Sequence, residues 1–385
     1  MNDKRIMDIE LLRGIAVLGV VFHHLQGSLF RDGLAWLGSV AAYGQFWWGV
    51  DLFFAISGFV IARSLVPQLR ACTSAAQFWQ RTRDFWIRRA FRLLPSAWLW
   101  LLLMLLATLF LNRSGAFGSL HANLWATVAG LLQFANLRFA DSFFHYEYGA
   151  SFVYWSLSLE EQFYLLLPLL VLLCRKYLAW ALLALVLVQI LTLRSALLMV
   201  IRTDAMALGV LLALWTARGS YRHWEPKWLG RYPGLGPLLL ILSCLGLGWL
   251  ATDGFNVTRY RVGALAVLCA LLVWIASYNR DYLLPRGLLK SLLAWVGSRS
   301  YGIYLIHVPV FLLVREAWFR LAPLGTTGLN EQPLLAMACA AGLLLLLSEL
   351  NYRVIELPLR NRGAELVQRL GAARSPVPST GVTSC

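Results

Sequence analysis

Long apolar runs are the feature of this 385-residue chain that most limits its fold. The runs from Leu99 to Leu111, from Leu178 to Leu193 and from Leu334 to Leu347 are three of several such runs. With their flanks they approach the ~20 residues needed to cross ~30 Å of hydrocarbon. Backbone groups in lipid must be hydrogen-bonded internally, and the sequence shows no alternating β-barrel pattern, so the runs predict helices. Charged residues make up only 14% of the chain, whereas a soluble domain averages about 25%. The sequence therefore predicts an all-α polytopic membrane protein.

The basic residues predict how these helices are oriented. The formal net charge of +15 could indicate a nucleic-acid partner, but the Lys and Arg residues lie between the apolar runs, as is typical of cytoplasmic loops. From Arg63 to Arg92 the chain has seven arginines and a single acid, Asp84. We therefore expect a multi-pass protein in contact with the lipid bilayer and with no nucleic acid, and with both termini in the cytoplasm.

Placing every basic segment in the cytoplasm limits the number of spans. Three apolar candidates lie between Arg92 and Arg175, which is one too many for an even number of crossings. The middle candidate, residues 121–139, is the shortest and carries Gln133 and Asn136. We expect it to be a re-entrant or interfacial segment, which leaves about ten transmembrane helices.

The domain organisation predicted from the sequence is simple. Residues 1–363 form one transmembrane domain, and residues 364–385 form a disordered cytoplasmic tail that ends in Ser, Pro, Thr and Gly. The six cysteines form no C-x-x-C pair and no metal-ligand spacing, so they predict no metal site.

The first span, residues 9–29, contains Arg13, His23 and His24. Ionisable residues inside a span are costly, so each is a candidate functional residue. Arg13 and His24 are eleven residues apart, which at 100° per residue brings them within about 20° of one helix face, ~16 Å apart along the axis. Alternatively, His24 is a packing histidine that donates to a backbone carbonyl.

Further polar residues lie in the second span and in a span near the middle of the chain. Asp51 is near the outer end of the second span and Ser57 near its middle. Ser156, Glu160 and Tyr164 are spaced at i, i+4 and i+8 and share one helix face. The alternatives are helix packing at Ser57 and, for the later span, an N-terminal cap with acids at the positive end of the helix dipole.

Two more pairs of polar residues follow. Arg202 and Asp204 open another span, and Tyr304 and His307 share a helix face near the end of the chain. For these residues a direct role competes with interhelical hydrogen bonds, snorkelling and helix ends.

Seven motifs occur in the order found in one family of enzymes. They are LLRGIAVLGVVFHH (11–24), GVDLFFAISGF (49–59), RRAFRLLP (88–95), WSLSLEEQFYLLLPLL (155–170), RTDAMALGVLLA (202–213), GSRSYGIYLIHVPV (297–310) and IELPLR (355–360). On these motifs the chain resembles the membrane acyltransferase-3 family, the multi-span O-acyltransferases of bacterial surface glycans. The resemblance implies that His24 is the catalytic histidine, and that Arg89 and Arg92 form a cytoplasmic Arg-x-x-Arg element. It also places Ser156, Glu160 and Tyr164 in the Ser-x-x-x-Glu-x-x-Phe-Tyr pattern of the family. His23 departs from the family, where its position is often aromatic.

Residues and resemblance together predict an integral-membrane O-acyltransferase, and the resemblance implies that it lies in the bacterial plasma membrane. Its co-substrate would be acyl-coenzyme A, by resemblance acetyl-coenzyme A, and no cofactor would be bound permanently. The phosphates of the donor would bind to arginines, which suit bidentate phosphate recognition. The expected donor-binding residues are Arg13, Arg88, Arg89 and Arg92.

The acceptor would be a hydroxyl of a glycan or of another surface molecule. His24 would act on it as a general base, or would carry the acyl group transiently, while Asp51 or Glu160 orients the imidazole. A transporter or flippase of a lipid-linked sugar or acyl group is the alternative, and a structural or sensory membrane protein is a third possibility.

Overall fold

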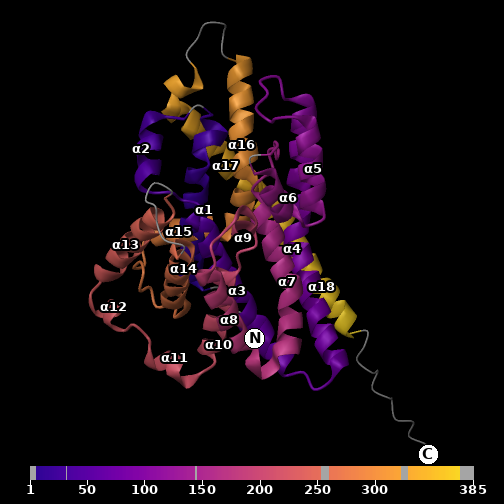
Figure 1. The fold of residues 1–385 in the computed structure, drawn as a ribbon, viewed down its shortest axis with the longest axis vertical. Coiled ribbons are helices and arrows are strands. Elements are labelled where there is room, and N and C mark those ends of the chain that lie inside the picture. The colour runs from indigo at the N-terminus through magenta and orange to yellow at the C-terminus, as the bar shows by residue number, and fades with distance from the viewer. Residues whose placement is uncertain (1–5, 32, 144, 253–259, 322–327, 373–385) are drawn as a thin grey trace, which may run out of the picture.

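A computed structural model describes residues 6–31, 33–143, 145–252, 260–321 and 328–372. These residues are helical apart from turns and one isolated bridge between Gln26 and Phe30. Figure 1 shows the long helices bundled along one axis of the molecule. The α-helices are α1 (Met7–His23), α2 (Ala35–Tyr43), α3 (Trp48–Arg70), α4 (Ala75–Phe110), α5 (Leu120–Leu131), α6 (Ala135–Ser142), α7 (Tyr154–Cys174), α8 (Leu178–Leu191), α9 (Ala196–Val200), α10 (Asp204–Thr216), α11 (Gly219–His223), α12 (Trp228–Arg231), α13 (Leu235–Leu250), α14 (Arg261–Ser277), α15 (Leu288–Ser298), α16 (Ser300–Leu321), α17 (Pro333–Asn351) and α18 (Leu357–Ala372). Short π and 3-10 turns complete the set: η1 (Leu25–Leu29), η2 (Arg175–Tyr177), η3 (Leu329–Glu331) and η4 (Tyr352–Glu356).

Within the described ranges, six stretches of helix are long and apolar enough to cross a membrane. Two further helical segments, Gly219–Arg231 and Leu235–Leu250, meet at a bend of 107° and would make a seventh span if they cross together. The six are Trp48–Arg70, Ala75–Phe110, Tyr154–Leu191, Ala196–Thr216, Ser300–Leu321 and Pro333–Gly371. The all-helical fold agrees with the sequence analysis, whereas the count of about ten spans stays a prediction. Helix α18 runs to Ala372 and so includes the first residues of the segment 364–385 that we expected to be a tail; residues 373–385 lie outside the described ranges.

Apolar side chains cover much of the outer surface of the bundle. On α4, Leu102, Leu106, Leu109 and Phe110 are all exposed, and the exposed fraction of Phe110 is 69%. Large contiguous apolar surface is rare on soluble monomers and indicates contact with another apolar phase. The surface therefore fits a helical protein in lipid.

The segment expected to be re-entrant or interfacial divides into α5 and α6. These helices have 12 and 8 residues, so at 1.5 Å per residue neither reaches the ~30 Å of a hydrocarbon core. Gln133 breaks the segment with a φ of 59°. The amides of Asn136 and Gln162 form two mutual hydrogen bonds of 3.1 and 2.9 Å, and Gln162 also donates to the carbonyl of Gln133. Helix α7 thus satisfies the polar groups that make this segment a poor span.

Glycines let the helices that carry the polar residues cross very closely. A Cβ on Gly58 of α3 would lie 2.1 Å from the carbonyl oxygen of Met206 in α10, and one on Gly209 would lie 2.2 Å from that of Ala55. Small residues at helix crossings permit this close approach in membranes. The glycine contacts fix α3 against α10, and both helices contribute polar residues to the centre of the bundle.

The basic segments gather at one end of the bundle. In Figure 1 the turn between α3 and α4, the turn between α7 and α8, and α11 all lie at the lower end. These are the arginine-rich or lysine-rich stretches that we expect to face the cytoplasm. We refer to this end as the basic end.

Candidate active site

His24 lies where the first helix breaks. Helix α1 ends at His23, and His24 is its C-terminal cap residue. The following turn, η1, leaves helical geometry at Gln26 and at Gly27, where φ is 87°. A positive φ of this kind is readily adopted by glycine but not by residues with a Cβ. The break therefore puts the half-buried His24 side chain at the end of α1, whereas we expected an uninterrupted span.

The ring of His24 pairs with a second histidine. Nδ1 of His24 lies 3.0 Å from Nε2 of His307 in α16, and Nδ1 of His307 lies 2.6 Å from the carbonyl oxygen of Tyr304. The ring of Phe152 packs edge-on against His24, with 5.3 Å between centroids. His307 is fully buried. The pair joins two residues that are 283 positions apart in the sequence.

The hydrogen bonds assign the tautomers of this pair. A carbonyl oxygen can only accept, so Nδ1 of His307 carries a hydrogen and, in the neutral ring, Nε2 is an acceptor. Nδ1 of His24 then donates to it, which leaves Nε2 of His24 with a lone pair. The backbone carbonyl of Val20 also interacts with the His24 ring. A neutral ring with a lone pair on Nε2 has the form that a general base requires.

Arg13 lies in a cavity near the basic end. Its Nη1 donates to Oε1 of Glu10 over 3.1 Å. The cavity has a volume of about 900 Å³ and lies among α1, α3, α4, α16 and the last helices of the chain; we call it cavity 1. It contains more arginines than acids, and its charged lining residues are Glu10, Arg13, Arg63, Arg92, Glu356 and Arg360.

The other arginines expected to bind the donor lie elsewhere. Arg88 lines a separate cavity of about 700 Å³, which we call cavity 2. Arg89 is directed at aromatic rings, with its guanidinium carbon 5.3 Å from the ring centroid of Tyr164 and 5.7 Å from that of Phe85. Of the four expected donor-binding arginines, only Arg13 and Arg92 therefore line cavity 1.

Ser57, Glu160 and Tyr164 form a polar cluster between α3 and α7. Ser57 donates to Oε1 of Glu160 over 3.1 Å, and the hydroxyl of Tyr164 donates to Oε2 over 2.7 Å. The Tyr164 hydroxyl also lies 3.2 Å from the Ser57 hydroxyl. Because each carboxylate oxygen accepts a hydrogen bond, Glu160 is well supported inside the bundle. Val60, which lies three positions after Ser57 on the same face of α3, lines cavity 1.

Ser156 of α7 and Tyr304 of α16 lie between this polar cluster and the histidine pair. Their hydroxyls lie 2.6 Å apart, and the carbonyl oxygen of Val153 lies within hydrogen-bond distance of both. Because each hydroxyl has a single hydrogen, one hydroxyl donates to the other, which donates to the carbonyl. Tyr304 in turn provides the carbonyl that holds His307. The polar groups of α1, α3, α7 and α16 thus form a column that begins beside cavity 1 and ends at His24.

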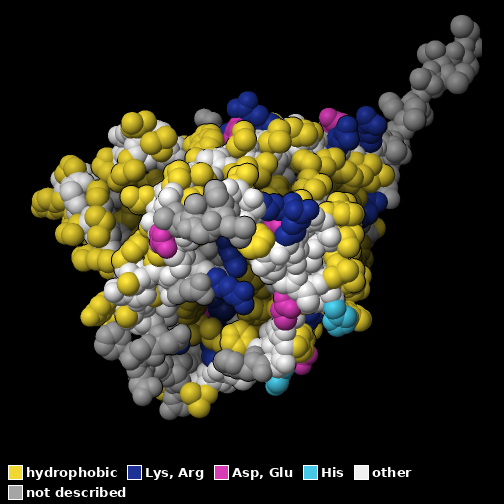
Figure 2. All heavy atoms as spheres, turned by 90° about the horizontal axis from the view of Figure 1, so that it is seen from above, with side chains coloured by type: hydrophobic (Ala, Val, Ile, Leu, Met, Phe, Trp, Pro, Cys, Tyr) yellow, Lys and Arg dark blue, Asp and Glu magenta, His cyan; other side chains and the backbone are white. Residues whose placement is uncertain are grey.

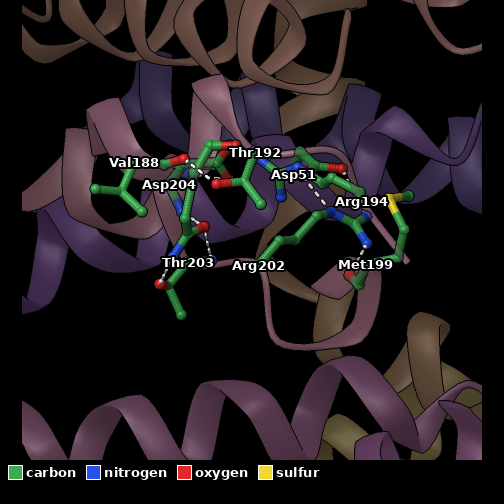
Figure 3. Close-up of polar contacts among 10 residues, drawn as sticks. Asp51, Val188, Thr192, Arg194, Met199, Arg202, Thr203 and Asp204 are labelled. Atoms are coloured by element: carbon green, nitrogen blue, oxygen red, sulfur yellow. Dashed lines mark hydrogen bonds and ion pairs between the residues drawn. The ribbon is translucent and has the colours of Figure 1, made fainter. Parts of the chain in front are cut away.

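Asp51 and Asp204 are held in buried ion pairs. Nε and Nη2 of Arg202 donate to the two carboxylate oxygens of Asp51, each over 2.8 Å, and Arg194 pairs with Asp204 (Figure 3). The guanidinium carbon of Arg202 also lies 4.9 Å from the ring centroid of Trp155. The side chain of Asp51 is fully buried and that of Arg202 is 3% exposed. Both oxygens of Asp51 are therefore occupied, which suits a residue that fixes α3 against the start of α10.

These contacts differ in one respect from the arrangement that we expected. We expected Asp51 or Glu160 to orient His24, but Nδ1 of His24 contacts His307, while Asp51 binds Arg202 and Glu160 binds the hydroxyls of Ser57 and Tyr164. We expected His307 only in a supporting role. Arg63, Arg194 and Arg360 were not among the expected site residues, because a single arginine near a span end looks like a topology signal.

The end opposite the basic end also carries polar side chains. Figure 2 looks onto it and shows Lys and Arg side chains around a hollow near the middle of the face, within a largely hydrophobic surround. Basic side chains are therefore not confined to the basic end.

Comparison with known proteins adds to this geometry. A family model described as an acyltransferase domain matches residues 6–350. The chain is 28% identical over 390 residues to peptidoglycan O-acetyltransferase OatA of Listeria monocytogenes, covering 94% of this chain and 57% of that protein. It is 28% identical over 394 residues to the putative peptidoglycan O-acetyltransferase YrhL of Bacillus subtilis, covering 94% and 56%. A putative O-acetyltransferase of Staphylococcus aureus is 25% identical over 399 residues, covering 94% and 58%.

The chain thus spans a little over half the length of these relatives. No solved structure matches it. The family match covers nearly all of the chain and contains both histidines, Arg13 and the acidic residues of α3 and α7. The chain therefore belongs to the acyltransferase-3 family.

Proposed function

We propose that the protein transfers an acetyl or other acyl group from acyl-coenzyme A, at the basic end, to a hydroxyl of a surface glycan that approaches from the opposite end. The observation that carries this proposal is the column of polar residues from cavity 1 to His24. The names of two relatives, a peptidoglycan O-acetyltransferase and a putative peptidoglycan O-acetyltransferase, support a glycan acceptor.

Cavity 1 suits a donor that carries several phosphates. Arg13, Arg63, Arg92 and Arg360 line it together with only two acids. Arginine binds phosphate through two parallel hydrogen bonds, and its planar head keeps its charge at any physiological pH. The volume of about 900 Å³ lies within the ~300–1,000 Å³ typical of small-molecule sites.

The proposed reaction uses Nε2 of His24. Nε2 removes the proton from the acceptor hydroxyl as its oxygen attacks the thioester carbonyl, and the C–S bond breaks when the tetrahedral intermediate collapses. The protonated ring then gives its proton to the departing thiolate, so the enzyme ends in its starting form. His307 accepts from Nδ1 of His24 throughout and stabilises the imidazolium.

We place the Ser57–Glu160–Tyr164 cluster along the path of the donor arm. Its hydroxyls lie on α3 and α7 between the cavity lining and Tyr304. Hydroxyl and carboxylate groups can pair with the amides of a pantetheine arm. In this proposal the cluster positions the donor and takes no part in the proton transfer.

Substitution of each adjacent histidine tests the proposal. We expect His24→Ala to lower acyl transfer by about 10²- to 10⁴-fold, as is typical for loss of a general base, while His23→Ala retains most of the activity. The measurement is mass spectrometry of surface glycans from cells that express each variant, with membrane insertion checked by immunoblot.

The opposite result would count against the assignment. An inserted His24→Ala protein that acylates glycans at the wild-type level would show that His24 is not the base. Movement of a labelled lipid-linked sugar without consumption of acyl-coenzyme A would favour the transporter or flippase alternative.

A further inference from the structure

Cavity 2 is a second polar cavity that the proposed reaction does not use. It has a volume of about 700 Å³ and lies between the end of α3, the first turns of α4 and the end of α18. Gln68 and Ala71 line both cavities, so cavity 1 and cavity 2 adjoin one another. A ligand with two distinct parts could therefore occupy both.

The lining of cavity 2 favours an anionic ligand with hydrogen-bonding groups. Arg81 and Arg88 line it, and within the part of the chain that the structure describes no ion pair reaches either arginine. The one acid in the lining, Asp84, is already paired with Arg83 over 3.0 Å. Three glutamines, Gln68, Gln77 and Gln80, supply amide donors and acceptors.

One face of α18 forms a wall of both cavities. Arg360 lines cavity 1, and Val367 and Gly371 line cavity 2. Gly363 packs between them against Phe91 of α4, where an added Cβ would lie 2.6 Å from the Cβ of Phe91. These four α18 residues are spaced at three, four and four positions and therefore share one helix face.

We propose that cavity 2 binds the phosphorylated adenosine of the coenzyme A donor, while cavity 1 holds its diphosphate and the start of the thioester arm. This inference rests on the proposed function. Acyl-coenzyme A is a single molecule with an acyl-pantetheine part and a nucleotide part, and the two adjoining cavities match that division. Arg81 and Arg88 bind the phosphate on the ribose, and the glutamine amides pair with the edge of the base. Helix α18 is thus part of the donor site.

Gly371 provides a clean test because a Cβ there would have no atom within 4 Å. Gly371→Trp therefore fills cavity 2 with little disturbance of the fold. The experiment uses the full chain in nanodiscs, with bound radiolabelled acetyl-coenzyme A displaced by adenosine 3′,5′-bisphosphate or by acetyl-pantetheine. In the wild type both compounds displace the label. In Gly371→Trp we expect the inhibition constant of the bisphosphate to rise at least tenfold relative to that of acetyl-pantetheine.

Two further variants complete the test. The Arg81→Gln/Arg88→Gln double variant should raise the inhibition constant of the bisphosphate by a similar factor, because two positive charges are lost. Gly342→Trp is the matched control, because Gly342 is exposed on α17, an added Cβ there also meets open space, and it lines neither cavity.

The outcomes separate this inference from the proposed function. An unchanged ratio of the two inhibition constants in both Gly371→Trp and the arginine double variant would overturn the assignment of cavity 2, and would be the result if a lipid headgroup occupies it. A wild-type protein that does not bind acetyl-coenzyme A would overturn the proposed function itself.

Discussion

Removal of the acceptor on His307 tests the reasoning about the histidine pair most directly. In His307→Leu the buried side chain keeps a similar apolar volume but no longer accepts the hydrogen from Nδ1 of His24, 3.0 Å away in the native pair. A hydrogen bond to a charged group contributes about 1.5–3 kcal/mol. His24 is charged only after it has taken the proton, so this loss falls on the transition state. At about 1.4 kcal/mol per factor of ten, kcat should fall about 10- to 150-fold, with little change in the KM of the donor.

The conservative variant separates a positioning role from a merely structural one. Gln at position 307 can place an amide oxygen near the native Nε2, so His307→Gln should recover a large part of the lost kcat. The assay is thiol release from acetyl-coenzyme A by purified protein supplied with its acceptor glycan, with thermal unfolding measured for each variant. The reasoning would be refuted if His307→Leu kept the wild-type kcat, or if Leu and Gln lowered kcat equally at equal stability.

Three other predictions concern a buried ion pair, an arginine of cavity 1 and an ion pair in a turn. Arg202→Leu should lower the free energy of unfolding by about 3–5 kcal/mol, because it leaves the carboxylate of Asp51 buried without its partner; Asp51→Leu added to it should restore much of the loss in thermal unfolding. Arg63→Gln should raise the KM of acetyl-coenzyme A with little change in kcat, and an unchanged KM would remove Arg63 from the donor site. In the turn before α15, burial raises the pKa of Asp281, but the hydrogen bond from Lys290 over 2.6 Å outweighs it and holds the pKa below its ordinary value. Stability from this pair is present above the unfolded pKa of about 3.9 and is lost as the pH falls through the lowered native pKa, so melting curves of the wild type and of Lys290→Met should converge below that range.

Local patterns in the sequence predicted local parts of the structure. The i, i+4, i+8 spacing placed Ser156, Glu160 and Tyr164 on one face of α7, and the structure joins Glu160 to Tyr164 by a hydrogen bond. Long apolar runs predicted the helices, because hydropathy is a property of each segment alone. The amides at Gln133 and Asn136 indicated a segment that does not cross the bilayer, and α5 and α6 are indeed too short to do so.

Contacts between distant segments could not be predicted in the same way. His24 and His307 are 283 positions apart, and Asp51 and Arg202 are 151 apart. Helical periodicity gives the face on which a residue lies but not the helix that packs against it. The Gln26-Gly27 dipeptide did contain a signal for the break after His24, since glycine is the residue that most readily adopts a positive φ.

That break also has an electrostatic consequence. Because α1 stops at His23, its last unpaired carbonyl groups lie beside the His24 ring. The C-terminus of a helix carries roughly half a negative elementary charge, which stabilises a neighbouring cation by up to ~2 kcal/mol when partly buried. The ring becomes a cation when it takes the proton of the acceptor. A substitution at Gly27 that let the helix continue would move this negative terminus away and slow the reaction, although the imidazole itself would be unchanged.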